Sequence, residues 1–173
     1  DCCTNYQKQY YYGNSNANIL IINDNATNDK DIIDYFNTLL EMSEINTDDI
    51  FIVNSVSCVT TRKDKGIEIQ RIPSKKECNN CKCFINQAIK IVNPRIIISL
   101  GATALNQFIP GSNLLEYINT KQVFNGIPTL INYSVKDLFD LTAYKTEDEI
   151  QEISCSILET FNEAAKYIQS IKE

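Results

Sequence analysis

Two side chains suited to site chemistry stand four residues apart, Asn54 and Cys58. The amide of Asn54 can both donate and accept hydrogen bonds, and a cysteine thiolate such as Cys58 can ligate a metal. The surrounding run 50–56 is short, apolar and rich in β-branched residues, which predicts a buried strand. We therefore expect a strand, a binding pocket and a metal site to meet here. The alternative is a core strand with a polar end and a buried thiol.

How the seven cysteines are interpreted depends on the cellular compartment in which the protein is expected. The first residues, Asp-Cys-Cys-Thr-Asn-Tyr, show no signal-peptide pattern, so we expect an intracellular, reducing location with metal ligands or buried thiols in place of disulfides. Cys78 and Cys81 form a Cys-x-x-Cys pair, a spacing that also suits zinc or redox chemistry. Cys83 falls on another face of the same expected helix, and Cys155 is expected in the core.

Composition excludes several classes of function. The chain has no histidine, which rules out Ser-His and Cys-His nucleophile pairs and zincin helices. A net charge of −6 argues against a protein covered in phosphate-binding surface. No apolar run approaches the roughly 20 residues of a membrane helix, so no membrane contact is expected. A local basic patch remains a candidate for DNA contact: Lys63, Lys65, Arg71, Lys75 and Lys76.

The elements that must position these residues alternate along the chain. A length of 173 residues predicts one domain over residues 1–173, with an N-terminal segment at 1–17. Buried strands are expected at 19–22, 50–56, 95–100 and 126–132, with an edge strand near 122–124. Helices are expected at 31–44, from Ser74 to the Asn93-Pro94 stop, at 101–108 and at 146–171. Residues 59–74 are expected to form a polar loop.

This alternation predicts an α/β fold, a three-layer α/β/α sandwich around a central four-stranded parallel sheet. Ligands of such folds bind beyond the carboxyl ends of the strands. The residues at those ends are Asn23-Asp24, Asn54-Ser55, Leu100-Gly101 and Asn132-Tyr133-Ser134.

Several motifs occur in an order that resembles one known family. Asn54-Ser-Val-Ser-Cys58 is similar to an Asn-Val-Val-Lys-Cys motif, and Arg71-Ile-Pro to an Arg-x-Pro segment followed by a helical cysteine, here Cys81. Pro94-Arg-Ile-Ile-Ile-Ser-Leu-Gly101 resembles a Pro-Lys-Val-Ile-Val-x-Leu-Gly strand. Together they resemble the family 4 uracil-DNA glycosylases, which carry an iron–sulfur cluster. The resemblance covers most of residues 18–140 and implies a uracil-DNA-glycosylase-like fold.

The resemblance implies a [4Fe–4S] cluster held by Cys2, Cys3, Cys58 and Cys81, with zinc or no metal as alternatives. The family's first two ligands form a Cys-x-x-Cys, whereas Cys2 and Cys3 are adjacent. Cys78 or Cys83 is therefore an alternative to one N-terminal ligand. The role of such a cluster would be structural, tying residues 1–17 to the loop after the second strand.

The departures from the family concern the catalytic groups. Asn23-Asp-Asn-Ala-Thr27 stands at the family's Gly-Glu-Ala-Pro-Gly, so only Asp24 keeps an acid that can orient water or stabilise a cation. The family's base-stacking Gly-x-Pro-Phe-Val-Gly is absent before Asp31, and Tyr133 is the candidate replacement ring. Ser134 stands at the family's histidine and can donate a hydrogen bond but carries no charge. Asn54 is the base-reading group that is kept.

Three hypotheses follow. The first is a divergent, catalytically impaired glycosylase-like protein that acts as a DNA- or protein-binding module in nucleic-acid metabolism. The second is an active uracil-DNA glycosylase of base excision repair that uses Asp24 and Asn54. The third is a structural subunit of a larger protein assembly that makes no DNA contact, which the acidic net charge favours.

Overall fold

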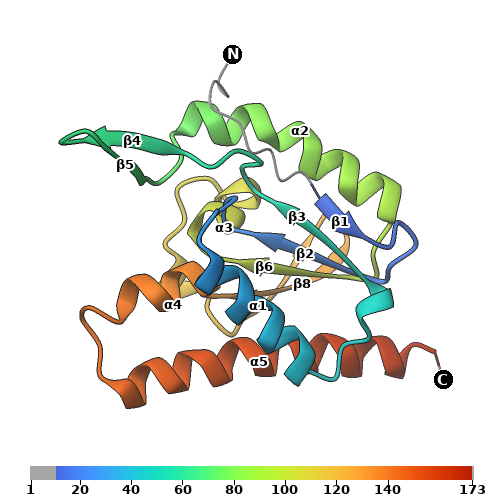
Figure 1. Ribbon diagram of the computed structural model, residues 1–173. Coiled ribbons are helices and arrows are strands. Elements are labelled where there is room, and N and C mark those ends of the chain that lie inside the picture. Colours follow the sequence, from blue (N-terminus) through green and yellow to red (C-terminus); the bar gives the residue numbers. More distant parts are fainter. Residues whose placement is uncertain (1–10, 173) are drawn as a thin grey trace.

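The computed structural model describes residues 11–172 and is built around one twisted sheet (Figure 1). Within that range the sheet has six strands in the order β1-β3-β2-β6-β8-β7. The four central strands are parallel, and β1 and β7 pair antiparallel at the two edges. The predicted four-stranded parallel core is therefore confirmed and is extended at both edges. The bounds are β1 Tyr11–Gly13, β2 Ile19–Asn23, β3 Ile50–Asn54, β6 Ile96–Leu100, β7 Lys121–Phe124 and β8 Ile127–Asn132.

The continuous apolar runs form central strands because successive side chains point to opposite faces, and both faces are covered. In β2, Ile19 and Ile21 pack into one hydrophobic cluster, and Leu20 and Ile22 pack into another. The first cluster is completed by α1, α4 and α5, and the second by α2 and α3, which gives the predicted three-layer α/β/α sandwich (Figure 1). The bounds are α1 Lys30–Met42, α2 Lys75–Val92, α3 Ala102–Phe108, α4 Val135–Leu141 and α5 Glu147–Ser170.

The helix boundaries follow from capping chemistry. Ser74 and Glu77 form the predicted capping box at the start of α2. Asn93 ends α2 in the left-handed conformation (φ 49°), which asparagine tolerates better than most residues, and proline follows. Thr146 caps α5 in the same way as Ser74 caps α2. The short helix α4 was not predicted, although Ser134 and Asp137 have the capping-box spacing.

The stretch expected to be a loop contains a β-hairpin, β4 (Thr61–Asp64) and β5 (Ile67–Gln70). Lys65 and Gly66 both have positive φ angles, 48° and 86°, and such two-residue turns match the twist of hairpin strands. The loop expectation was wrong because β4 (Thr-Arg-Lys-Asp) contains no apolar residue and β5 contains only two, Ile67 and Ile69, so the stretch carries little apolar signal. A second correction concerns Cys155, which is exposed on α5 and does not lie in the core.

The hairpin extends from the body but is fixed at its base (Figure 1). The Gln70 Nε2 amide donates to the Ala26 carbonyl (3.0 Å), and the Thr27 hydroxyl donates to Gln70 Oε1 (3.0 Å). Arg71 donates to both carboxylate oxygens of Glu77, at 2.7 and 2.8 Å. The hairpin is therefore attached both to the segment that follows β2 and to the first turn of α2.

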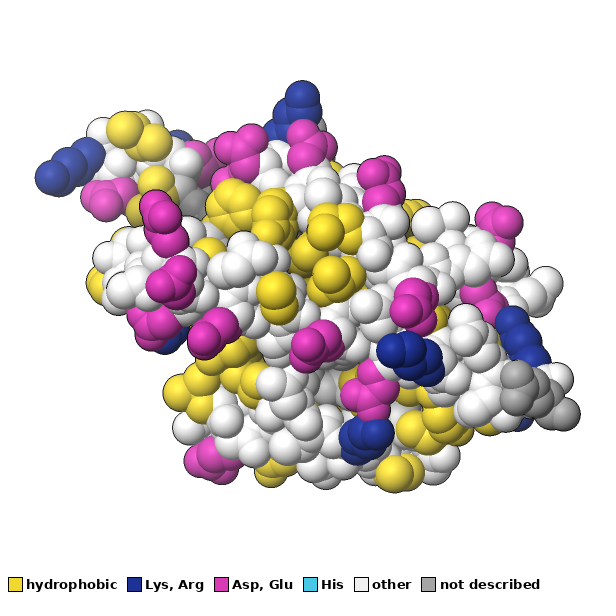
Figure 2. Space-filling model, turned by 90° about the horizontal axis from the view of Figure 1, so that it is seen from below, with side chains coloured by type: hydrophobic (Ala, Val, Ile, Leu, Met, Phe, Trp, Pro, Cys, Tyr) yellow, Lys and Arg dark blue, Asp and Glu magenta, His cyan; other side chains and the backbone are white. Residues whose placement is uncertain are grey.

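The surface opposite α2 is acidic. Figure 2 shows the face seen from below, where Asp and Glu side chains are scattered around a central group of hydrophobic side chains. Among the described residues, no helix is both long and apolar enough to cross a membrane.

Candidate active site

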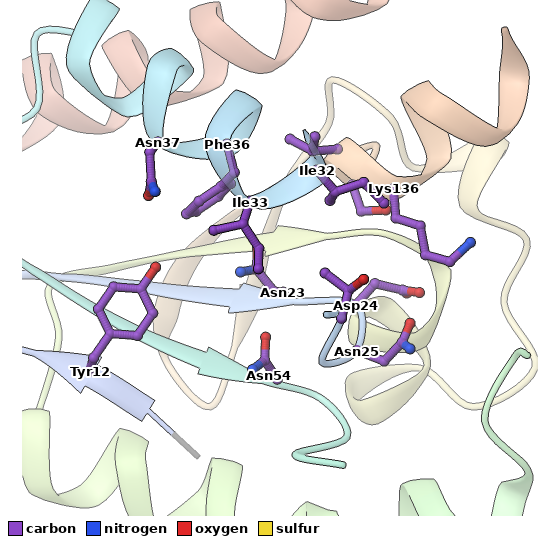
Figure 3. Close-up of a pocket in the computed structure, with 13 residues that line it drawn as sticks. Tyr12, Asn23, Asp24, Asn25, Ile32, Ile33, Phe36, Asn37, Asn54 and Lys136 are labelled. Carbon is purple, nitrogen blue, oxygen red and sulfur yellow. The ribbon is translucent and has the colours of Figure 1, made fainter. Parts of the chain in front are cut away.

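A cavity of about 660 Å³ lies beyond the carboxyl ends of β2 and β3, the position expected for ligands in this fold (Figure 3). Asn23 and Asp24 reach it from β2, and Asn54 reaches it from β3. Helix α1 forms one wall, and Ser134 and Lys136 belong to the start of α4. The structure therefore brings together Asp24, Asn54 and Ser134, three side chains that the sequence had placed at separate strand ends.

The pairing of the two strands places Asn23 directly beside Asn54, and Asp24 is the next residue along the chain. Asn23 and Asn54 are direct partners in the parallel register of β2 and β3. The backbone N–H and the hydroxyl of Ser55 both donate to the Asn23 carbonyl, at 2.8 and 2.7 Å. These bonds join the two strand ends, so the backbone from which Asn23 and Asn54 project is held by the sheet.

Asp24 is held by the turn that follows β6. The backbone N–H of Thr103, in the first turn of α3, donates to Asp24 Oδ1 at 2.6 Å. Gly101 makes this approach possible, because a Cβ at that position would lie 2.7 Å from Asp24 Oδ1 and 2.8 Å from its Cβ. Gly101 also has φ +92°, which disfavours any other residue. The predicted strand-to-helix turn at Gly101 therefore leaves room for the Asp24 side chain and holds it in place.

The pKa of Asp24 is raised from 3.8 to about 6. Burial is the largest cause, and the negative charge of Asp137 adds to it. The hydrogen bonds from Thr103 and the positive charge of Lys136 act in the opposite direction. Near neutral pH the carboxyl group is mostly ionised, as a group that orients water or stabilises a cation must be.

The Ser134 hydroxyl lies at the cavity but is already engaged. It donates to Asp137 Oδ2 (2.8 Å) and accepts from the Asp137 backbone N–H (3.0 Å), which completes the capping box of α4. Its single proton is therefore directed at a carboxylate and away from the cavity. Among the described residues that line the cavity, Lys136 is the one with a cationic side chain, and it forms an ion pair with Asp140.

The aromatic ring expected from Tyr133 is not among the residues that line the cavity, because Tyr133 packs against the hydrophobic core. Phe36 of α1 and Tyr12 of β1 line the cavity instead. Phe36 also packs edge-to-face on Phe161 of α5. Only the pairing of β1 beside β3 could have revealed Tyr12 as a site residue.

Comparison with known proteins agrees with this geometry. The sequence matches the uracil DNA glycosylase superfamily over residues 10–153. The chain belongs to this superfamily. It is 30% identical over 131 residues to a protein from Thermotoga maritima named Type-4 uracil-DNA glycosylase. The aligned stretch is 76% of this chain and 62% of that relative, so the chain spans less than two thirds of the relative's length. The expected superfamily and the resemblance to its family 4 are thus confirmed.

The cysteines of this superfamily member divide by burial. Cys58 and Cys81 are buried, with exposed fractions of 7% and 3%, whereas Cys83 is exposed and Cys78 is half-buried. Gln107 Nε2 donates to the carbonyls of Ser55 (3.3 Å) and Cys78 (3.2 Å), which holds the segment leading to Cys58 against α2.

Cys58 and Cys81 are two of the four cysteines expected to hold a cluster. The other two expected ligands, Cys2 and Cys3, lie outside the described residues. Within residues 11–172, no group of three or more His, Cys, Asp or Glu side chains is placed to hold a metal ion. The alternative site built around Cys78 therefore finds no complete ligand set in this part of the chain.

The candidate DNA-contact residues of this glycosylase-superfamily member fall on one projecting region. Lys63 and Lys65 lie on the exposed hairpin, and Lys75 and Lys76 are exposed in the first turn of α2. Arg71 differs from these lysines because its guanidinium is committed to Glu77. Of the five candidate DNA-contact residues, the four lysines are therefore exposed, and Arg71 has a structural role.

Proposed function

We propose that this protein binds a deaminated base flipped out of DNA and excises it slowly. The observation that carries the proposal is the meeting of Asp24 and Asn54 in one cavity at the carboxyl ends of β2 and β3. The superfamily to which the chain belongs supports DNA as the macromolecule. The large cavity supports a base that has left the stack, because a paired base could not enter it.

Each residue has a defined task in this proposal. The Asn54 amide reads the N–H and C=O groups on the base edge. The carboxylate of Asp24 orients a water toward the sugar carbon and stabilises positive charge there. The water oxygen bonds to that carbon as the carbon–nitrogen bond breaks. The base leaves with the bonding electron pair and takes up a proton.

We expect excision to be slow because the leaving base is poorly stabilised. Its electron pair needs a donor or a positive charge nearby, and the hydroxyl of Ser134 already donates to Asp137. Loss of one such donor typically costs about 100- to 1,000-fold in rate. We therefore expect base binding to survive better than catalysis.

The test is binding and base release on a single-stranded oligonucleotide that contains one uracil, compared with the same strand carrying cytosine. We expect tighter binding of the uracil strand and release at about one hundredth of the rate of an active family 4 enzyme assayed in parallel. Asn54→Ala should remove the binding preference, and Asp24→Asn should abolish the residual release. Equal binding of the two strands would overturn the base-reading role, and release at the rate of the active enzyme would overturn the impairment.

A gain of activity makes the test sharper. Ser134→His places an imidazole where the hydroxyl now caps α4, and we expect release to rise by about 100-fold. Ser134→Ala is the matched control, because it loses the same cap without adding a donor. An increase in base release by Ser134→His is attributed to the imidazole only where it exceeds the change caused by Ser134→Ala.

We also propose that Cys58 and Cys81, with Cys2 and Cys3, hold a [4Fe–4S] cluster. The burial of both described thiols, the Gln107 bridge between their segments and the type-4 relative support it. The cluster would fix the N-terminal segment next to the hairpin that carries Lys63 and Lys65. These lysines, with Lys75 and Lys76, would contact phosphates, so DNA binding should weaken as salt rises.

A further inference from the structure

An exposed isoleucine directly follows the base of the hairpin. Ile72 is 84% exposed and belongs to none of the hydrophobic clusters in the described part of the chain. Its backbone is fixed on both sides, because Arg71 is bonded to Thr60 and Glu77, and Pro73 is buried. Ile72 therefore presents an apolar side chain to solvent from a backbone that is held in place.

Ile72 also lies close to the cavity. The side chain of Gln70, two residues earlier, is bonded to Ala26 and Thr27, and Thr27 lines the cavity. Two residues of chain span at most about 7 Å, so Ile72 cannot be far from this attachment. Figure 1 shows the hairpin projecting on the side of the molecule where β2 and β3 end. Since Ile72 does not itself line the cavity, it lies near the rim and outside the pocket.

The charges that follow Ile72 suit a nucleic-acid backbone. Lys75 and Lys76 are exposed in the first turn of α2, three and four residues along the chain. The carboxylate of Glu77 in the same turn is paired with Arg71, so it offsets the arginine and not the lysines. Two exposed cations thus accompany an exposed aliphatic side chain. Proteins use this combination where they hold phosphates and insert an apolar group between base pairs.

A flipped base leaves a gap in a duplex that has no equivalent in a single strand. In the duplex, the flipped base loses its stacking and its pairing, and this cost must be offset by the protein. An apolar side chain that enters the gap replaces part of the lost contact with the neighbouring base pairs. A single strand has no partner strand to hold such a gap open, so an inserted side chain contributes little there.

We propose that Ile72 enters double-stranded DNA at the place vacated by the flipped base, while Lys75 and Lys76 bind the phosphates beside it. The partner of this surface is therefore a duplex that contains a deaminated base. This rests on the proposed function and names the form of DNA on which it acts. The fixed backbone at Arg71 and Pro73 suits the role, because a mobile side chain would yield to the stacked bases.

The experiment measures the affinity of the full chain for one uracil-containing oligonucleotide in two forms. One form is single-stranded, and the other is paired with a complement that places guanine opposite the uracil. We expect Ile72→Ala to weaken binding to the duplex about tenfold and to change binding to the single strand less than about twofold. Ile72→Leu keeps the apolar bulk and should retain the duplex affinity of the unsubstituted protein.

Ile67→Ala is the matched control for Ile72→Ala. Ile67 is also an exposed isoleucine (68%) of this region, but it lies at the far end of β5, next to the hairpin turn. We expect it to leave both affinities unchanged. A tenfold loss of duplex binding in Ile67→Ala with none in Ile72→Ala would overturn the assignment.

Three other results would also overturn this inference: an equal loss on both forms in Ile72→Ala, no loss on the duplex, or no detectable duplex binding by the unsubstituted protein. In each case the proposed function stands if the uracil single strand still binds more tightly than the same strand with cytosine. Equal binding of those two single strands would overturn the proposed function and this inference with it.

Discussion

Asp24 is an acid surrounded by groups that act on it in opposite directions. Burial and Asp137 raise its pKa, and the Thr103 hydrogen bonds and Lys136 lower it, with a net value of about 6. The folded-state pKa therefore lies above the ordinary value of 3.8. Because the unfolded chain releases this proton first, the Asp24 contribution to stability declines as pH rises between 3.8 and about 6.

Two substitutions beside Asp24 should move its titration in opposite directions. Lys136→Gln removes a cation and should raise the pKa of Asp24 above 6, whereas Asp137→Asn removes an anion and should lower it. The measurement is the ¹³C chemical shift of the Asp24 carboxyl carbon as a function of pH. Asp34→Asn is the control for a general change of charge, because Asp34 is exposed on α1 and should leave the titration unchanged. Shifts of the same sign in Lys136→Gln and Asp137→Asn would contradict this electrostatic account.

At the scale of single residues, the sequence predicted which of these side chains lie together better than it predicted their hydrogen bonds. Asp24, Asn54 and Ser134 could be placed because polar residues that end parallel strands converge at one edge. The Ser134 hydroxyl bonds to Asp137 because the two residues cap α4. That helix has only seven residues, too few for its apolar pattern to be recognised in the sequence. Tyr12 lines the cavity because β1 pairs with β3, and residue spacing alone does not specify that pairing.

Among the elements, the hairpin and α2 share one anchor. Glu77 caps α2 through Ser74 and accepts both hydrogen bonds from Arg71 at the base of the hairpin. The Arg71 bonds, followed by those from Ser74, lower the pKa of Glu77 from 4.5 to about 2. The stabilisation from Glu77 is thus present above pH 4.5 and is lost as pH falls toward 2.

Glu77→Gln should release the hairpin while α2 stays folded. The variant weakens the cap of α2 and the bidentate Arg71–Glu77 pair together, and we expect it to lower the free energy of unfolding by about 1–2 kcal/mol. Hydrogen exchange should show faster exchange of the backbone amides of β4 and β5, with little change in the central strands. Glu149→Gln removes the equivalent capping carboxylate of α5 and should leave the hairpin unaffected. If both variants give the same hairpin exchange, the anchor is not Glu77.

The elements themselves were largely predictable. The four central strands carry continuous apolar runs, and α2 and α5 begin at capping boxes that can be recognised from spacing. The hairpin was not predicted, because its two strands are mostly exposed and no core-facing apolar pattern marks them. Its stability comes from the contacts of Gln70 and Arg71, which join residues distant in the sequence.

For the whole molecule, the proposed cluster joins the N-terminus, the loop after β3 and α2. Anaerobically purified protein should contain about four iron and four sulfide per chain if the site is a [4Fe–4S] cluster. Cys58→Ser and Cys81→Ser should each lower the iron content sharply and decrease the thermal midpoint. Cys155→Ser is the matched control at an exposed cysteine and should change neither. Zinc in place of iron, or full iron content in the Cys81→Ser variant, would refute the assignment.

The close approach of Gly101 and Asp24 also limits how such a protein can evolve. The two residues follow different strands, yet no side chain at 101 is compatible with the present position of the acid. A lineage that acquires any larger residue at 101 must first move or shorten the side chain at 24. We therefore expect a residue other than glycine at 101 only in relatives that also differ at 24, whereas position 24 can change while 101 stays glycine.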